Sequence, residues 1–129
     1  MKRAFIIAFV ATVLIVAWFT NSNSDDDVGL NQSILHNGIS RDYILYIPEN
    51  LPTNAPLVVV SHGYTSSAKT MMSYSGMNKV ADEEKFLVVY PQGTKDQRGN
   101  NFFNVGYEFH APSKVDDLGF IKALVTKLT

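Results

Sequence analysis

Cysteine is absent from the sequence, which excludes disulfides, thiolate nucleophiles and cysteine-ligated zinc. Basic residues are few and scattered, and the formal net charge is −1. Phosphate binding needs a concentrated basic surface, so we expect no nucleic-acid partner. Internal repeats and low-complexity segments are lacking as well. The remaining composition suits a packed core, with 46% hydrophobic and 18% charged residues, and the length of 129 residues favours one domain.

The N-terminus is ordered like an export signal. Lys2 and Arg3 precede an apolar stretch, and small polar residues follow it. This order predicts a secretory signal peptide over residues 1–24, followed by a polar linker at 25–29. The alternative is an uncleaved anchor at residues 4–20, because the apolar stretch falls only slightly short of a bilayer span. We therefore expect a secreted or periplasmic protein, or in the alternative a protein that contacts the membrane through this segment only.

The domain predicted for residues 30–129 begins with a β-hairpin. Two strand-like segments, 30–35 and 39–47, flank Asn37 and Gly38. An Asn-Gly pair favours a tight hairpin turn because both residues tolerate positive φ.

A strand–helix–strand unit follows the hairpin. Unbroken apolar runs at 57–60 and 86–90 predict strands buried on both faces, as in a parallel sheet. Between them, apolar residues at helical spacing predict one helix from about 68 to 84. A last helix is predicted from about residue 115 onward, with carboxylates at its N-terminus. The fold class is therefore α/β, with a mostly parallel sheet that begins with the N-terminal β-hairpin.

The candidate site lies at the carboxyl end of the first buried strand, where ligands bind in open parallel sheets. His62, Gly63 and Tyr64 follow that strand directly. A glycine here lets the backbone turn so that the next N–H groups face the cleft, where a developing oxyanion needs donors. Tyr64 is the first candidate for that N–H and Gly63 the second, although Tyr64 also fits a turn residue that lines the cleft. For His62 we favour a role in shaping the loop over that of a catalytic base.

Four aromatic residues gather farther along the chain, and two of them, Phe103 and Tyr107, are candidate cleft-lining residues. Together with Phe102 and Phe109 they fit either of two interpretations. One is stacking on a phenolic or sugar ring, and the other is a loop packed over the sheet.

Other polar residues have simpler interpretations. His110, Asp116 and Asp117 have metal-ligand side chains, but their spacing matches no ligand pattern, so a loop and a helix cap are favoured. Ser66 and Ser67 lie between a strand and a helix, where serines most often cap the helix. We expect no metal and no cofactor.

From residue 41 to residue 127 the chain resembles the secreted polyhydroxybutyrate depolymerase-like and feruloyl-esterase-like enzymes of the α/β-hydrolase superfamily. The resemblance rests on short segments in the family's order and spacing, with Phe103 where the family usually has Trp. These segments are YILYIP at 43–48, PLVVVSHGY at 56–64, GMN at 76–78, AD at 81–82, FLVVYPQG at 86–93, NVG at 104–106 and VDDLGFI at 115–121. The resemblance implies a serine esterase, with Tyr64 and Gly63 supplying oxyanion N–H groups.

The chain departs from the family in having no catalytic triad. No serine stands in a G-x-S-x-G pattern, which is the nucleophile motif of α/β-hydrolases. The resemblance implies that the sequence covers the N-terminal portion of the fold, is truncated before the nucleophile strand, and is inactive alone. The nucleophile, acid and base are expected beyond Thr129. In the family's strand order, the absent strand would pair with residues 57–60, which are therefore expected to form an open edge.

Two functions follow for the exported part. The first is the N-terminal portion of a serine carboxylic-ester hydrolase that acts on polyhydroxyalkanoates or on feruloyl or acetyl esters of polysaccharides. The alternative is a complete, non-catalytic α/β remnant that binds an aromatic or carbohydrate ligand.

Overall fold

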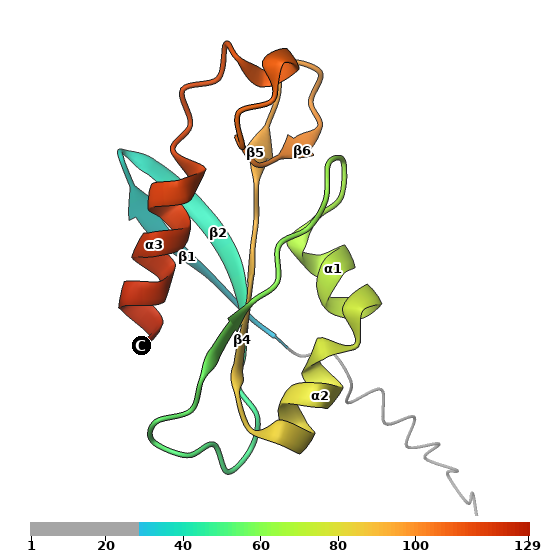
Figure 1. The fold of residues 1–129 in the computed structure, drawn as a ribbon, viewed down its shortest axis with the longest axis vertical. Helices are drawn as coiled ribbons and strands as arrows, with labels where there is room; N and C mark the ends of the chain where they lie inside the picture. The colour runs from blue at the N-terminus through green and yellow to red at the C-terminus, as the bar shows by residue number, and fades with distance from the viewer. Residues whose placement is uncertain (1–28) are drawn as a thin grey trace, which may run out of the picture.

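The computed structural model describes residues 29–129. The predicted signal or anchor segment and nearly all of the predicted linker lie outside these residues. Within the described part, four strands form one sheet in the order β1-β2-β4-β3 (Figure 1). Its β1–β2 and β2–β4 pairs are antiparallel and its β3–β4 pair is parallel, so the sheet of these residues is mixed and not mostly parallel. No helix in that part is long and apolar enough to cross a membrane.

The N-terminal hairpin forms as predicted. β1 (Leu30–His36) pairs antiparallel with β2 (Ile39–Tyr46). Asn37 and Gly38 make the turn with φ of 50° and 77°, the left-handed region that an Asn-Gly pair enters at low cost.

The strand–helix–strand unit is also present, with one difference in its helical part. β3 (Leu57–Val59) and β4 (Leu87–Pro91) are parallel neighbours. The single helix predicted between them is wrong, because two helices, α1 (Ala68–Ser75) and α2 (Met77–Glu84), meet at Gly76. Gly76 has a φ of 64° and ends α1 in the left-handed conformation, which a glycine adopts without steric cost.

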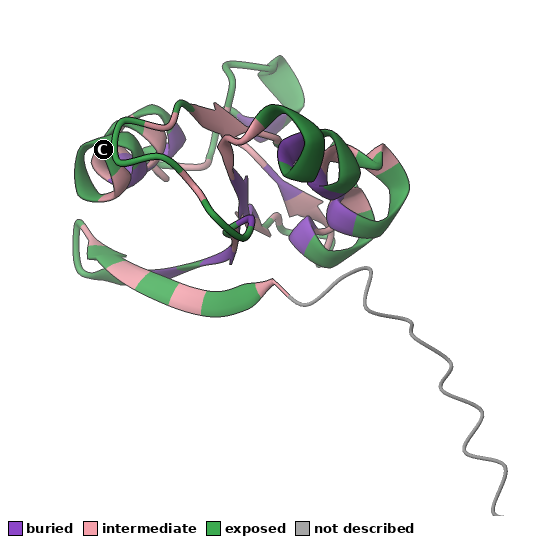
Figure 2. Ribbon diagram, turned by 90° about the horizontal axis from the view of Figure 1, so that it is seen from below, coloured by how far each residue is buried: buried purple, intermediate pink, exposed green. Residues whose placement is uncertain are grey.

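The helices cover the two faces of the sheet (Figure 2). Ala68 and Met72 of α1 and Ala81 of α2 pack on Ile44 and Val88. On the other face, α3 (Asp117–Leu128) packs Phe120 and Leu124 on β-strand residues Tyr43, Leu45 and Val89. The core is therefore two apolar layers with the central strands β2 and β4 between them.

The apolar run at 57–60 packs against both core layers, as expected, with Val60 on one face and Leu57 and Val59 on the other, but its residues are only half-buried. β3 has β4 on one side and is the last strand of the sheet in the described residues, while β4 lies between β2 and β3. The open edge expected at this run is therefore observed. Such an edge exposes unpaired backbone groups and favours association with another strand.

Beyond the carboxyl end of β4, the chain forms the small elements that surround the site. β5 (Thr94–Lys95) and β6 (Asn101–Phe102) pair as a short antiparallel ribbon. The 3₁₀ turn η1 (Glu108–His110) follows, and the chain then returns to the start of α3 (Figure 1).

Candidate functional site

A cavity of about 750 Å³ lies beyond the carboxyl end of β3 and next to the N-terminus of α3. All five residues that the sequence marked as site candidates line it. These residues are His62, Gly63, Tyr64, Phe103 and Tyr107. The first three come from the loop after β3 and the last two from the loop after β6, so the fold joins two segments that are about 40 residues apart.

His62 joins the loops that follow β3 and β4. Its Nε2 accepts a hydrogen bond from the Gly93 N–H at 3.0 Å, and its Nδ1 lies 2.8 Å from the Gly63 carbonyl oxygen. Because Nε2 is an acceptor, the proton resides on Nδ1, which donates to Gly63. Both ring nitrogens are thus used within the loops, and neither is free to take a proton from a substrate.

Gly93 also lies so close to the backbone of β6 that there is no room for a side chain. A Cβ at Gly93 would lie 2.2 Å from the carbonyl oxygen of Phe102, so only glycine lets the two backbones approach. At Gly63 the situation is the reverse. A Cβ there would meet nothing within 4 Å, and the φ of Gly63 is not in the left-handed region.

The expectation that the loop needs the backbone freedom of glycine at position 63 is therefore wrong. The residue of this loop in the left-handed conformation is Thr65, with a φ of 70°. Thr65 N–H donates to the Asn101 carbonyl at 2.9 Å, which fastens the loop to β6. Within the described residues, neither the Gly63 nor the Tyr64 N–H donates to a backbone carbonyl. The Gly63 and Tyr64 N–H groups, the candidate oxyanion donors, thus make no hydrogen bond to a backbone carbonyl of the described residues.

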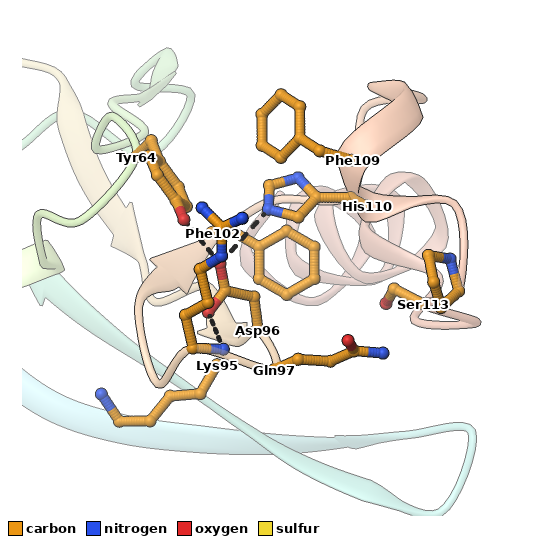
Figure 3. Close-up of a pocket in the computed structure, with 10 residues that line it drawn as sticks. Tyr64, Lys95, Asp96, Gln97, Phe102, Phe109, His110 and Ser113 are labelled. Atoms are coloured by element: carbon orange, nitrogen blue, oxygen red, sulfur yellow. Dashed lines mark hydrogen bonds and ion pairs between the residues drawn. The ribbon is translucent and has the colours of Figure 1, made fainter.

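The Tyr64 side chain is committed to a second cluster, centred on Asp96 (Figure 3). Tyr64 Oη donates to Asp96 Oδ2 at 2.7 Å and accepts from Asn100 Nδ2 at 2.9 Å. Several donors together lower the pKa of Asp96 to about 2: the Tyr64 hydroxyl contributes most, followed by the N–H groups of Asn100 and Arg98 and by the His110 side chain. The hydrogen bond to Asp96 raises the pKa of the Tyr64 phenol, because loss of its proton would break it.

The aromatic residues divide between the two interpretations. Phe102 is buried, and Phe103 packs on the His62 ring with centroids 4.7 Å apart. Tyr107 and Phe109 stack on each other at 5.4 Å and 10°, with 59% and 61% of their surfaces exposed. Phe102 and Phe103 therefore fit the interpretation of a packed loop. Tyr107 and Phe109 instead present flat, exposed rings at the cavity.

The sequence reasoning missed a buried ion pair beneath the cavity. Arg41 and Asp117 are 2% and 4% exposed, and Arg41 Nη2 donates to Asp117 Oδ1 at 2.5 Å. Asp117 Oδ2 accepts from the Asn104 N–H at 2.6 Å. The pair thus links β2, α3 and the loop after β6, which carries Asn104. The sequence did hold one signal of this pair. Residues 41, 43 and 45 share one face of a strand, and a charged Arg41 beside the apolar Tyr43 and Leu45 indicates a buried cation that needs a partner.

The residues with metal-ligand side chains separate in space. Asp116 caps α3 by accepting from the Gly119 N–H, and this bond, followed by the contact with His36, lowers the Asp116 pKa. Asp117 pairs with Arg41, and His110 lies next to Asp96 instead. Among the described residues, no group of three His, Asp or Glu side chains is placed to hold a metal ion. Ser67 caps α1 by accepting from the Thr70 N–H, as expected.

Comparison with known proteins gives esterase-related relatives over part of the chain. No protein-family model matches. The chain is 41% identical over 59 residues to poly(3-hydroxyalkanoate) depolymerase C of Paucimonas lemoignei, covering 46% of this chain and 14% of that enzyme. It is 39% identical over 56 residues to a bifunctional acetylxylan esterase/xylanase of Neocallimastix patriciarum, covering 43% and 8%. It is 38% identical over 48 residues to acetylxylan esterase A of Talaromyces purpureogenus, covering 37% and 13%. The matched stretches therefore span less than a sixth of each relative, and the curated relatives are carboxylic-ester hydrolases.

Proposed function

We propose that residues 30–129 are the N-terminal portion of an exported serine carboxylic-ester hydrolase with an α/β-hydrolase fold. The observation that carries this proposal is the meeting of His62, Gly63, Tyr64, Phe103 and Tyr107 around one cavity at the end of a parallel strand. Ligand sites in open α/β sheets lie at such strand ends. The names of the relatives support ester hydrolysis as the reaction.

In this proposal, the loop after β3 supplies the oxyanion hole. The Tyr64 N–H, with that of Gly63 second, donates to the carbonyl oxygen of the ester as it becomes an oxyanion. His62 holds the loop in place through its bonds to Gly93 and Gly63. The open space over Gly63 leaves room for the acyl group next to these donors.

The covalent steps require a serine, an aspartate and a histidine from outside this sequence. The serine oxygen would attack the ester carbonyl, the alcohol would leave with the proton from the serine, and water would then release the acid. We therefore also propose that residues 1–129 alone do not hydrolyse esters. Polyhydroxyalkanoates and acetylated polysaccharides are the candidate substrates, since they are what the names of the relatives specify.

The first test is to sequence the source DNA past codon 129. An open frame that continues into a strand and a G-x-S-x-G motif supports the proposal. A stop codon at that point overturns it in favour of the alternative, a protein that binds its ligand without cleaving it.

The second test uses the product of the full reading frame and p-nitrophenyl acetate. Tyr64→Pro removes both the N–H and the phenol, while the matched Tyr64→Ala removes the phenol only. We expect kcat of the proline variant to fall about 10²- to 10³-fold below that of the alanine variant, the loss typical of one oxyanion donor. Equal kcat values in two folded variants would assign the oxyanion N–H to another residue.

A further inference from the structure

The two candidate oxyanion donors, Gly63 and Tyr64, begin a turn that has a strained third residue. The Ser66 N–H donates to the Gly63 carbonyl at 3.2 Å and closes this turn, which we call the oxyanion turn. Its third residue, Thr65, has a φ of 70°, and of the four non-glycine residues with positive φ in the described part of the chain it is the β-branched one. A turn with positive φ at its third residue favours glycine there, and for a β-branched residue this conformation is an outlier. Contacts with the surroundings must therefore hold Thr65 in place.

Asn101, the first residue of β6, contacts the oxyanion turn at two consecutive residues. Its backbone carbonyl accepts from the Thr65 N–H at 2.9 Å, and its Nδ2 donates to the Ser66 carbonyl at 2.7 Å. Its Oδ1 accepts from Lys95 Nζ at 3.1 Å, so the oxygen of the amide faces the cation and the nitrogen faces the turn. The half-buried Asn101 side chain is thus held on one side by Lys95 and binds the turn on the other.

The two ends of the loop between β3 and α1 are fixed by other residues. At its start, His62 Nε2 accepts from the Gly93 N–H at 3.0 Å. At its end, Gln92 Oε1 accepts from the Ala68 N–H at 3.0 Å. Among the described residues, Asn101 is the one outside this loop that forms hydrogen bonds with the backbone of the oxyanion turn. The conformation of the middle of the loop therefore depends on Asn101.

The amide of Asn101 is the part of this contact that a substitution can remove. Without it, one hydrogen bond from the Thr65 N–H remains against the steric cost of the left-handed conformation, and the turn relaxes. Relaxation displaces the Gly63 and Tyr64 N–H groups from the position of the oxyanion. Such donors act on charge that develops in the transition state, so their displacement lowers kcat and leaves KM nearly unchanged.

We propose that Asn101 is a positioning residue for ester hydrolysis, because its amide holds Thr65 in the left-handed conformation and thereby fixes the oxyanion turn. The inference rests on the proposed function, which assigns the oxyanion to the Gly63 and Tyr64 N–H groups. It goes beyond that function by making β6, which supplies no donor to the oxyanion, responsible for the geometry of the donors.

The kinetic test uses the product of the full reading frame, p-nitrophenyl acetate and the variant Asn101→Ala. Alanine removes the amide and keeps the backbone carbonyl that accepts from Thr65. We expect kcat to fall about 10²-fold, the loss typical of a displacement of about 1 Å, while KM stays nearly constant. Asn54→Ala, at an exposed loop position, is the matched control and should keep the kcat of the unaltered enzyme.

A rescue experiment separates positioning from a general loss of stability. Glycine enters the left-handed region without steric cost, so Thr65→Gly keeps the turn without help from the Asn101 amide. In the Asn101→Ala enzyme, adding Thr65→Gly should therefore restore kcat to within about threefold of Thr65→Gly alone. Lys85→Gly is the control, because Lys85 ends α2 with a φ of 59°. It relieves the same kind of strain far from the turn in sequence, and it should restore no activity to Asn101→Ala.

A second measurement reads the conformation of the turn directly and needs no esterase activity. Three-bond NMR couplings about the N–Cα bond of residue 65 report its φ in the isotope-labelled chain. We expect a positive φ in the unaltered chain, its loss in Asn101→Ala, and its return when Thr65→Gly is added.

The outcomes separate this inference from the proposed function. An active enzyme in which Asn101→Ala leaves kcat unchanged, or in which Thr65→Gly rescues no better than Lys85→Gly, would overturn the role of Asn101 and leave the hydrolase standing. A positive φ at residue 65 that survives Asn101→Ala would do the same. A full-length product that does not cleave p-nitrophenyl acetate would overturn the proposed function and this inference together.

Discussion

The ion pair between Arg41 and Asp117 supports a quantitative prediction for the variant Asp117→Asn. The asparagine keeps the shape of the side chain and can still accept from the Asn104 N–H, but it removes the negative charge. Arg41, which is 2% exposed, then remains as a buried cation without its counter-ion. Removing one partner of a buried pair typically costs about 3–5 kcal/mol.

We expect a loss near the lower end of this range. Arg41 retains a contact to the Gln92 carbonyl at 3.4 Å and lies 4.0 Å over the Phe120 ring, and both partly compensate its charge. A domain of this size has a free energy of unfolding of roughly 5–15 kcal/mol, so a loss of about 3 kcal/mol is a large share of it. With a urea m-value of about 1.5 kcal/mol per M, the midpoint falls by about 2 M.

The assay is urea unfolding of freshly isolated monomer at low concentration, followed by far-UV circular dichroism at pH 7. The neighbouring variant Asp116→Asn is the matched control, because Asp116 is exposed and asparagine caps a helix about as well as aspartate. We expect the control to lose less than about 1 kcal/mol.

The double variant Arg41→Met with Asp117→Asn tests the cause. It removes both charges, so it should be more stable than Asp117→Asn alone, by about 1–2 kcal/mol. An Asp117→Asn chain within about 1 kcal/mol of the unaltered one, at the same m-value, would refute the argument that this pair holds the loop to the sheet.

Two further predictions concern the cavity. Tyr64→Phe should raise the pKa of Asp96 from about 2 toward its ordinary value of 3.8, as measured by carboxyl ¹³C NMR titration; a pKa that stays near 2 would mean that the backbone donors suffice. Since the folded pKa is the lower one, this carboxylate stabilises the fold above pH 4 and ceases to do so as the pH falls toward 2, and the variant should lose less stability across that window. Gly93→Ala should lower the thermal midpoint by several degrees, because its Cβ would lie 2.2 Å from a backbone oxygen. The control Gly63→Ala, whose Cβ meets nothing within 4 Å, should leave the midpoint unchanged. Equal shifts in the two variants would contradict the close approach of Gly93 to β6.

Much of the fold followed from local patterns. The Asn37-Gly38 turn and the Ser67 and Asp116 caps were predicted, because each depends on a few neighbouring residues. The parallel pairing of β3 and β4 was predicted from two unbroken apolar runs joined by a helical segment. The break at Gly76 was missed, since apolar periodicity continues across a glycine that tertiary packing places in the left-handed conformation.

The candidate site was predictable only in part. The strand-end rule located His62, Gly63 and Tyr64, and the aromatic pattern located Phe103 and Tyr107. No local pattern shows that His62 bonds Gly93, that Tyr64 bonds Asp96, or that His110 lies buried next to Asp96. Each of these contacts joins residues from separate loops, and the approach of those loops depends on the whole sheet.

The sequence by itself thus determined the N-terminal hairpin, the strands at the two apolar runs and the position of the loop that follows β3. These features arise from short-range sterics and from the spacing of apolar residues. Only the tertiary structure decided that Asp117 is a buried partner of Arg41 while its neighbour Asp116 caps a helix, and that Gly63 faces open space while Gly93 has none. The physical reason is that burial and pairing are properties of the packed chain, and adjacent residues of the same type can meet opposite surroundings.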